Sequence, residues 1–187
     1  NMKKRIISIL LAVCLIFGLL PVGVLAASAT SGSCGKNATW SYNAATKTLS
    51  ISGSGDMTDY ETDPVMGIEN TPPWDAYREE IEHVIINLGI TSIGSEAFGS
   101  SYASYPNLTS VSIAPTVTRI GNYAFAGAEK LESIELPNVT SIGYSSFAGT
   151  GIRSIYIPPT VVAGEGDIDS GLGWFINCTN LQTITVD

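Results

Sequence analysis

One stretch of sequence is repeated in tandem in the second half of this chain. Val117 to Val139 reads VTRIGNYAFAGAEKLESIELPNV, and Val139 to Val161 reads VTSIGYSSFAGTGIRSIYIPPTV. A less regular copy begins ITSIGSEAF at Ile90 and ends LTSVSIAPTV at Val117. A unit this short cannot bury its own apolar residues, so tandem copies predict a solenoid in which each coil packs against the next.

The repeats align on an aliphatic strand pattern. Five copies share three aliphatic positions with the spacing i, i+3 and i+5, beginning at Ile81, Leu108, Leu131, Ile152 and Leu181. The starts are separated by 27, 23, 21 and 29 residues, which places insertions at Ser100 to Pro106 and at Val162 to Gly171. We therefore expect about five parallel strands, one per coil.

Between the strands a second motif recurs, in which Ile-Gly precedes a phenylalanine. Phe98, Phe125 and Phe147 occupy the same place in three copies, and Gly173-Trp174-Phe175 is a degenerate fourth. We expect these rings to stack on the side opposite the strands, and the glycines to let the backbone turn tightly.

The N-terminus predicts export. A basic segment before an apolar run from Ile6 to Leu20, and a small-residue exit ending at Ala26, are typical of a secretory signal peptide spanning residues 1–26. Without the three cations of that segment, the mature chain has six cationic and 17 acidic residues, a net charge of −11. Such a chain has no electrostatic footprint for nucleic acid, and we expect no membrane insertion after signal cleavage.

Residues 27–33 read as a linker, and residues 34–80 as an N-terminal cap. Ala38 to Tyr42 and Thr48 to Ser52 alternate in polarity, which predicts a β-hairpin lying as a lid on the first coil. Tyr60 to Thr71 is expected to be an acidic, irregular surface loop. Pro72 to Glu80 is expected to be a short helical turn that packs Trp74 and Tyr77 under the hairpin.

The strings IGxxAFxG and LxSIxLP resemble the BspA-like repeats of bacterial surface proteins, also called the Treponema pallidum type of leucine-rich repeat. The resemblance covers residues 81–186, and the cap region also looks like that of such proteins. It implies an α/β-type, β-rich leucine-rich-repeat solenoid of residues 81–187. It also implies a bacterial protein, secreted or at the cell surface, that mediates adhesion or protein binding, with host matrix or other cell-surface proteins as partners.

The outward strand positions form columns along the predicted stack. Our candidate ligand-binding column is Ile85, Ser112, Glu135, Tyr156 and Thr185, with Tyr156 as the anchor, and Glu132 and Arg153 belong to a neighbouring column. Aromatic anchors often dominate binding energy. The alternative, that these are ordinary solvated strand residues, remains open. A column of His83, Ser110, Ser133, Ser154 and Thr183 predicts a ladder of side-chain hydrogen bonds.

No pattern predicts catalysis, a metal or a cofactor. His83 is the only histidine, and the motif Asp167-x-Asp169-x-Gly171 lacks the closing glutamate of a calcium loop. We expect Cys34 and Cys178 to be unpaired thiols, because they lie near opposite ends of the chain.

The sequence thus predicts a non-enzymatic binding module. The alternative is a structural spacer or display stalk within a longer surface protein or secreted enzyme. Because the sequence stops at Asp187 within a strand pattern, we also expect the repeats to be truncated at that end.

Overall fold

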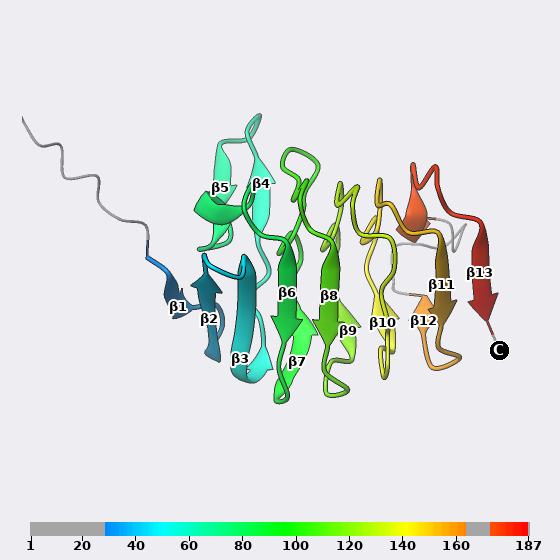
Figure 1. The fold of residues 1–187 in the computed structure, drawn as a ribbon, viewed down its shortest axis with the longest axis horizontal. Coiled ribbons are helices and arrows are strands. Elements are labelled where there is room, and N and C mark those ends of the chain that lie inside the picture. The colour runs from blue at the N-terminus through cyan, green and yellow to red at the C-terminus, as the bar shows by residue number, and fades with distance from the viewer. Residues whose placement is uncertain (1–28, 164–172, 187) are drawn as a thin grey trace, which may run out of the picture.

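The computed structural model describes residues 29–163 and 173–186 of the chain (Figure 1). The expected signal peptide, the Asp167 motif and most of the insertion from Val162 lie outside these ranges. The described residues form 13 strands and two 3₁₀ turns, without an α-helix. The β-rich architecture expected from the sequence is therefore confirmed.

The N-terminal hairpin is present, but it continues the sheet instead of covering it as a lid. Its strands are β1 (Ser31–Ser33), β2 (Asn37–Asn43) and β3 (Thr48–Asp56). Trp40 pairs with Ile51 across β2 and β3, and both side chains are buried. The β3 strand then pairs in parallel with β6 (His83–Ile86), with Leu49 opposite Val84. The cap and the repeats therefore share one hydrogen-bonded sheet.

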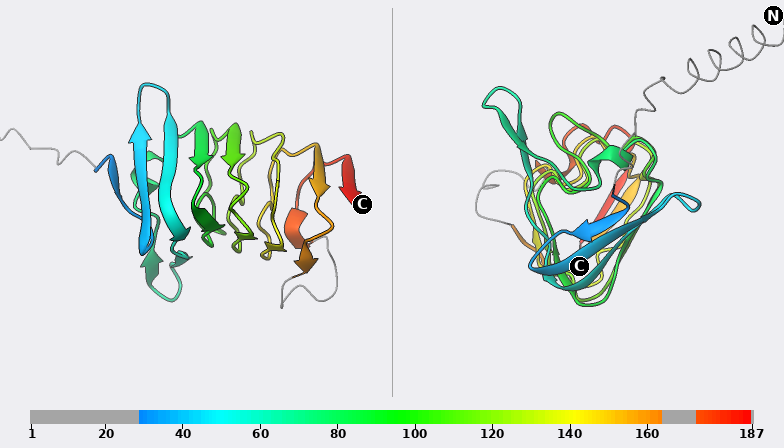
Figure 2. Two further views of the ribbon diagram at one scale, coloured as in Figure 1. Left: turned by 90° about the horizontal axis from the view of Figure 1, so that it is seen from below. Right: turned by 90° about the vertical axis from the view of Figure 1, so that its left-hand side faces the viewer.

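The long strands of the repeats stack side by side on one face (Figure 2, left). They are β6, β8 (Ser110–Ile113), β11 (Ser154–Ile157) and β13 (Thr183–Val186). β6 pairs in parallel with β8, and β11 with β13, each in the register that the sequence alignment predicts.

The expected third strand, Leu131 to Leu136, is not a strand, and that prediction was wrong. Leu131, Ile134 and Leu136 are buried as the pattern requires. The segment nevertheless forms no backbone ladder with β8 in the described part of the chain. Aliphatic periodicity determines which side chains are buried, and that burial is achieved here without strand pairing.

A second set of short strands runs along another side of the stack. These are β7 (Ile90–Ile93), β9 (Arg119–Ile120), β10 (Ser141–Ile142) and β12 (Val162–Ala163), paired in parallel in that order. β3 joins this sheet through Gly55 and Asp56. The sequence analysis did not predict these strands, because each is only two to four residues long.

The glycines that follow these strands allow close packing between coils. A Cβ atom at Gly94 would lie 1.9 Å from the Thr58 carbonyl oxygen, and one at Gly121 would lie 2.3 Å from the Ser95 nitrogen. Gly143 approaches the previous coil in the same way, with 2.6 Å to the Asn122 nitrogen. These glycines are thus required by the neighbouring backbone rather than by a tight turn.

The phenylalanine column is confirmed. Successive rings of Phe98, Phe125, Phe147 and Phe175 are stacked with centroids 5.5–5.8 Å apart, and Trp74 stacks on Phe98 at 5.6 Å. Phe175 comes from the 3₁₀ turn η2 (Gly173–Phe175). The column joins the cap to the last repeat through one continuous aromatic contact.

A left-handed backbone residue recurs two positions before three of these phenylalanines. Glu96, Tyr123 and Ser145 have φ values of 52°, 53° and 51°. This conformation is unfavourable for residues other than glycine, so each of these repeats contains the same local strain.

The expected irregular loop from Tyr60 to Thr71 is instead a small hairpin of β4 (Glu61–Asp63) and β5 (Ile68–Asn70), so that prediction was wrong. The Asp63 carboxylate accepts the backbone N–H groups of Val65 and Met66, and Gly67 has a φ of 70°. Such an Asx turn followed by a left-handed glycine closes a hairpin. The tip is exposed, with Val65 88% and Met66 76% accessible.

The expected short turn after this hairpin is η1 (Asp75–Tyr77). Its aromatic residues pack under the N-terminal hairpin, with Tyr42 and Tyr77 stacked at 4.4 Å and Trp40 6.0 Å from Trp74. Burial raises the pKa of Tyr42 to about 12, and a hydrogen bond that its hydroxyl donates to Glu80 at 3.1 Å adds to the shift.

Both described cysteines are free thiols, as predicted. Cys34 is buried, and burial raises its pKa to about 12. Cys178 is partly buried and donates to the Phe147 carbonyl at 2.9 Å. The buried Cys34 is therefore not an activated thiolate.

Candidate functional site

The strand face brings the proposed ligand-binding residues together in two groups. Ile85 lies opposite Ser112 across β6 and β8, and Tyr156 lies opposite Thr185 across β11 and β13. Glu135 lies between the groups, on the segment that leaves the ladder. Ile85 is 37% and Tyr156 46% exposed, so both side chains present apolar surface outward.

A groove of about 500 Å³ lies beside Tyr156. Its walls combine one aromatic ring, one carboxylate and three prolines, and its lining residues are Ile134, Glu135, Leu136, Pro137, Asn138, Tyr156, Pro158, Pro159 and Thr160. Glu135 and Tyr156, chosen from the sequence as neighbours in one column, thus line one groove. Its volume is within the range of about 300–1,000 Å³ typical of ligand pockets.

A second hollow of about 300 Å³ lies on the other side of the unpaired segment, between it and β8. Ser112 and Glu135 line it from opposite sides. Both hollows exist because residues 131–136 do not close the ladder between β8 and β11, so the face is furrowed there instead of flat.

Glu132 and Arg153 do not line either hollow. They form an ion pair with one another, with Arg153 Nη2 2.7 Å from Glu132 Oε1 and both side chains 61% exposed. An exposed pair of this kind contributes little to stability. Together with the bond from the Arg153 N–H to the Glu132 carbonyl (3.1 Å), it connects the unpaired segment to the next repeat.

The expected hydroxyl ladder forms at only one step in the described part of the chain. His83 Nδ1 lies 2.8 Å from Ser110 Oγ, and the other side chains of that column form no such bonds with each other.

The sequence analysis named no proline among its candidate site residues. The structure makes Pro137, Pro158 and Pro159 walls of the groove beside Tyr156. The sequence contained a signal for these walls. Pro137 follows Glu135 by two positions, and Pro158 and Pro159 follow Tyr156 by two and three positions.

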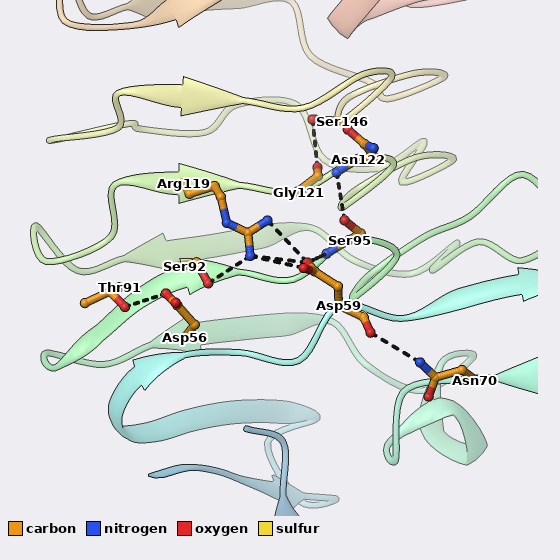
Figure 3. A network of polar contacts seen from close by, with 10 residues as sticks. All are labelled: Asp56, Asp59, Asn70, Thr91, Ser92, Ser95, Arg119, Gly121, Asn122 and Ser146. Atoms are coloured by element: carbon orange, nitrogen blue, oxygen red, sulfur yellow. Dashed lines mark hydrogen bonds and ion pairs between the residues drawn. The ribbon is translucent and has the colours of Figure 1, made fainter. Parts of the chain in front are cut away.

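A polar network lies on the side of the short strands (Figure 3). Arg119 of β9 donates to the Asp59 carboxylate of the cap at 3.3 Å, and Asp59 also accepts the Ser95 N–H at 2.7 Å. Asp56 accepts the Thr91 hydroxyl at 2.7 Å, and this bond lowers the pKa of Asp56. Every member has a partner within the network, so we interpret it as a connection between cap and repeats.

In residues 29–163 and 173–186, no group of three or more histidine, cysteine, aspartate or glutamate side chains is placed to hold a metal ion. Within the same residues, no helix has the length and hydropathy needed to cross a membrane.

Comparisons with known proteins identify the repeat type. Residues 100–187 match the family model described as "BspA type Leucine rich repeat region (6 copies)". No curated protein matches the chain. Repeats of this family typically mediate protein–protein interaction, are non-enzymatic and are often found in surface-associated bacterial proteins.

Three solved structures share the fold. A leucine-rich repeat protein from Eubacterium ventriosum is 28% identical with a TM-score of 0.57, and the match covers 84% of this chain and 44% of that one. A leucine rich cell surface protein from Faecalibacterium prausnitzii is 24% identical, with a TM-score of 0.50 and coverage of 86% and 43%. A leucine-rich repeat protein from Bacteroides ovatus is 20% identical, with a TM-score of 0.50 and coverage of 82% and 40%.

This chain therefore spans less than half the length of each of these proteins. The recurring Ile-Gly and phenylalanine motifs, their stacking in space and the family match agree with one another. Residues 100–187 of this chain are therefore BspA-type leucine-rich repeats.

Proposed function

We propose that this chain is an exported, non-enzymatic protein-binding module that mediates adhesion at the cell surface. In this proposal residues 81–187 form a solenoid of about five coils, and residues 34–80 cap it. The observation that carries the proposal is the groove in which Glu135 and Tyr156 lie together.

The groove has the features of a peptide-binding surface. Tyr156 offers a large apolar surface with few rotatable bonds, the kind of residue that anchors protein interfaces. Pro137 and Pro159 provide exposed walls that lose little backbone entropy when a ligand binds, because the proline ring already fixes φ. An aromatic ring beside rigid apolar walls suits an extended chain segment.

Its partner is a protein, such as a host matrix protein or a protein of another cell. The formal net charge of the whole chain is −8, which disfavours nucleic acid and anionic surfaces. Glu135 places one negative charge in the groove, so a partner segment that carries a cation beside its apolar residues is favoured.

The proposal can be tested with a phage-displayed library of random dodecapeptides, selected on the purified chain. We expect enriched sequence families whose binding falls at least about tenfold in Tyr156→Ala. The matched control is Tyr144→Ala, because Tyr144 is 42% exposed but lies outside the groove. Peptides that bind the wild type and Tyr156→Ala equally would remove the groove from the site, and a selection without enrichment would favour the structural spacer.

Export is tested separately by mass spectrometry of the culture medium and the cell envelope. We expect a mature chain that begins at Ala27 in one of these fractions. A chain that retains residues 1–26 and stays in the cytoplasm would contradict the proposed localisation without bearing on the groove.

A further inference from the structure

A cavity lies between two segments that interrupt the repeat pattern. The β4–β5 hairpin and the loop inserted at Ser100 to Pro106 project on the same side of the molecule (Figure 1), and a cavity of about 190 Å³ separates them. Thr62 and Pro64 line it from the hairpin, and Ser100 and Tyr102 line it from the loop. It belongs neither to the strand face nor to the groove beside Tyr156.

The loop wall is fixed by its own hydrogen bonds. The Ser100 side-chain oxygen accepts the backbone N–H groups of Tyr102 and Ala103 at 3.1 and 2.9 Å. The ring of Tyr102 is 57% exposed at the cavity. These bonds fix the backbone of the loop, and an exposed ring on it can receive a cation on its face.

Glu96 supplies a carboxylate to the same cavity. It accepts the Thr62 N–H at 3.0 Å, which attaches the hairpin to the first repeat. Among the described residues, no lysine, arginine or histidine forms an ion pair with it. Burial raises the pKa of this carboxyl, and the hydrogen bonds from Thr62 offset that shift only in part.

The one cation in the wall is already neutralised. Arg78 Nη1 lies 3.3 Å from Asp75 Oδ2, and Arg78 Nε lies 3.6 Å from Glu79 Oε1. The hairpin adds Glu61, Asp63 and Glu69 to the surroundings without a cation of its own. The charge that lacks a partner at this cavity is therefore negative.

A buried tyrosine forms part of the cavity wall. Tyr105 lines the cavity and is 2% exposed, and its hydroxyl has no hydrogen-bond partner among the described residues. The neighbouring indole N–H, that of Trp74, donates instead to the Ala97 carbonyl at 3.1 Å.

We propose that this cavity is a second binding site, which takes a guanidinium or ammonium group between the Glu96 carboxylate and the face of Tyr102. The volume admits one side chain or one small ion and not a drug-sized ligand. The cation pairs with Glu96 in a site that is partly withdrawn from water, where a charge-assisted hydrogen bond is stronger than at an open surface. The group is either a lysine or arginine side chain of a partner protein or a free polyamine.

The test is a titration of the isotope-labelled chain followed by amide NMR signals. The probes are arginine blocked at both ends, lysine blocked in the same way, and putrescine. Blocked citrulline is the matched ligand control, because it has the shape of arginine without its charge. We expect saturable shifts at Thr62, Glu96 and Tyr102 with the cationic probes and at least about fivefold weaker binding of citrulline.

Two variants make the result specific. Glu96→Gln keeps the acceptor for the Thr62 N–H and removes the charge, and Tyr102→Leu keeps bulk and removes the aromatic face. We expect each to weaken the cationic probes at least about fivefold, while Tyr156→Ala leaves them unchanged. Equal binding of citrulline, full binding by Glu96→Gln, or an absence of shifts at this cavity would each overturn the proposal.

A protein side chain and a free polyamine predict different orders of affinity among the probes. Stronger binding of blocked arginine or lysine than of putrescine assigns the site to a protein side chain, and the reverse order assigns it to a free polyamine. The site stands independently of the groove beside Tyr156, so the failure of either proposal leaves the other intact.

Discussion

The strand face contains two neighbouring regions with the same sequence pattern and different backbone pairing. In the first, β3, β6 and β8 form a continuous parallel ladder from the cap into the repeats. In the second, Leu131 to Leu136 repeats the aliphatic pattern of β8, yet it lies outside the ladder between β8 and β11. Side-chain burial is nearly the same in both, because Leu108 and Leu131 are each 0% exposed.

A strand usually buries apolar side chains and also pairs its backbone with its neighbours. Residues 131–136 do only the first of these. The apolar residues of the second region still fill the core, so the stack stays continuous through the phenylalanine column. The backbone of residues 131–136 forms no ladder with β8, and this leaves the two hollows that Glu135 lines. A repeat protein can thus vary its surface in one coil without changing its core.

The largest expected effect is on the free energy of unfolding, and it tests whether the two regions unfold as one cooperative unit. Phe125 is fully buried and stacks between Phe98 and Phe147, so Phe125→Ala should destabilise the fold by about 3–5 kcal/mol. We expect one cooperative transition in guanidinium denaturation, followed by the fluorescence of Trp40, Trp74 and Trp174. Separate transitions in the wild-type chain would show that the interrupted ladder divides the molecule in two.

The next effect tests the difference in backbone pairing directly. Ser110 and Ser133 are equivalent, exposed positions, and the Ser110 N–H donates to the Glu82 carbonyl at 3.3 Å. Ser110→Pro should therefore cost about 1–3 kcal/mol in the free energy of unfolding. Ser133→Pro should cost at least about 1 kcal/mol less, because its N–H has no ladder partner.

Ser110→Ala is the control for the side-chain contact with His83. Equal losses in the two proline variants would mean that residues 131–136 are paired in solution.

The smallest effect concerns pH at the junction between β3 and the short strands. The Thr91 hydroxyl bond lowers the pKa of Asp56, so its contribution to stability is present above the unfolded pKa of about 3.9. That contribution is lost as the pH falls through the lower, folded value. Because Asp56 is exposed, we expect less than about 1 kcal/mol.

The measurement is urea denaturation between pH 2 and pH 6. Asp56→Asn keeps an acceptor for Thr91 and should flatten the part of the acid slope that depends on Asp56. A variant slope identical to that of the wild type would show that this bond is absent in solution.

Much of the fold could be predicted because it depends on side-chain period. The register of β6 with β8, the stacking of Phe98 on Phe125 and the burial of Trp40 all follow from the spacing of apolar residues. The pairing failure of residues 131–136 could not be predicted, because Ile134 and Leu136 are buried with or without a ladder.

Other features depend on contacts that a linear pattern does not contain. The β4–β5 hairpin is closed by the Asp63 side chain, and its sequence is too polar and too short to indicate a strand. Glu135 and Tyr156 could be selected from one column. The proline walls beside Tyr156, and the meeting of Glu96 with Tyr102, required the three-dimensional structure.

The left-handed residues at Glu96, Tyr123 and Ser145 matter for anyone who would build with this repeat. Each has a side chain where glycine or asparagine would adopt the same φ at lower cost, a difference of about 1 kcal/mol per position. In a tandem array such a difference adds once per copy, so a designed consensus with asparagine at this position gains stability in proportion to its length. Replacing the left-handed residue in one unit, and building an array from copies of that unit, is therefore expected to stabilise the array beyond the natural repeat.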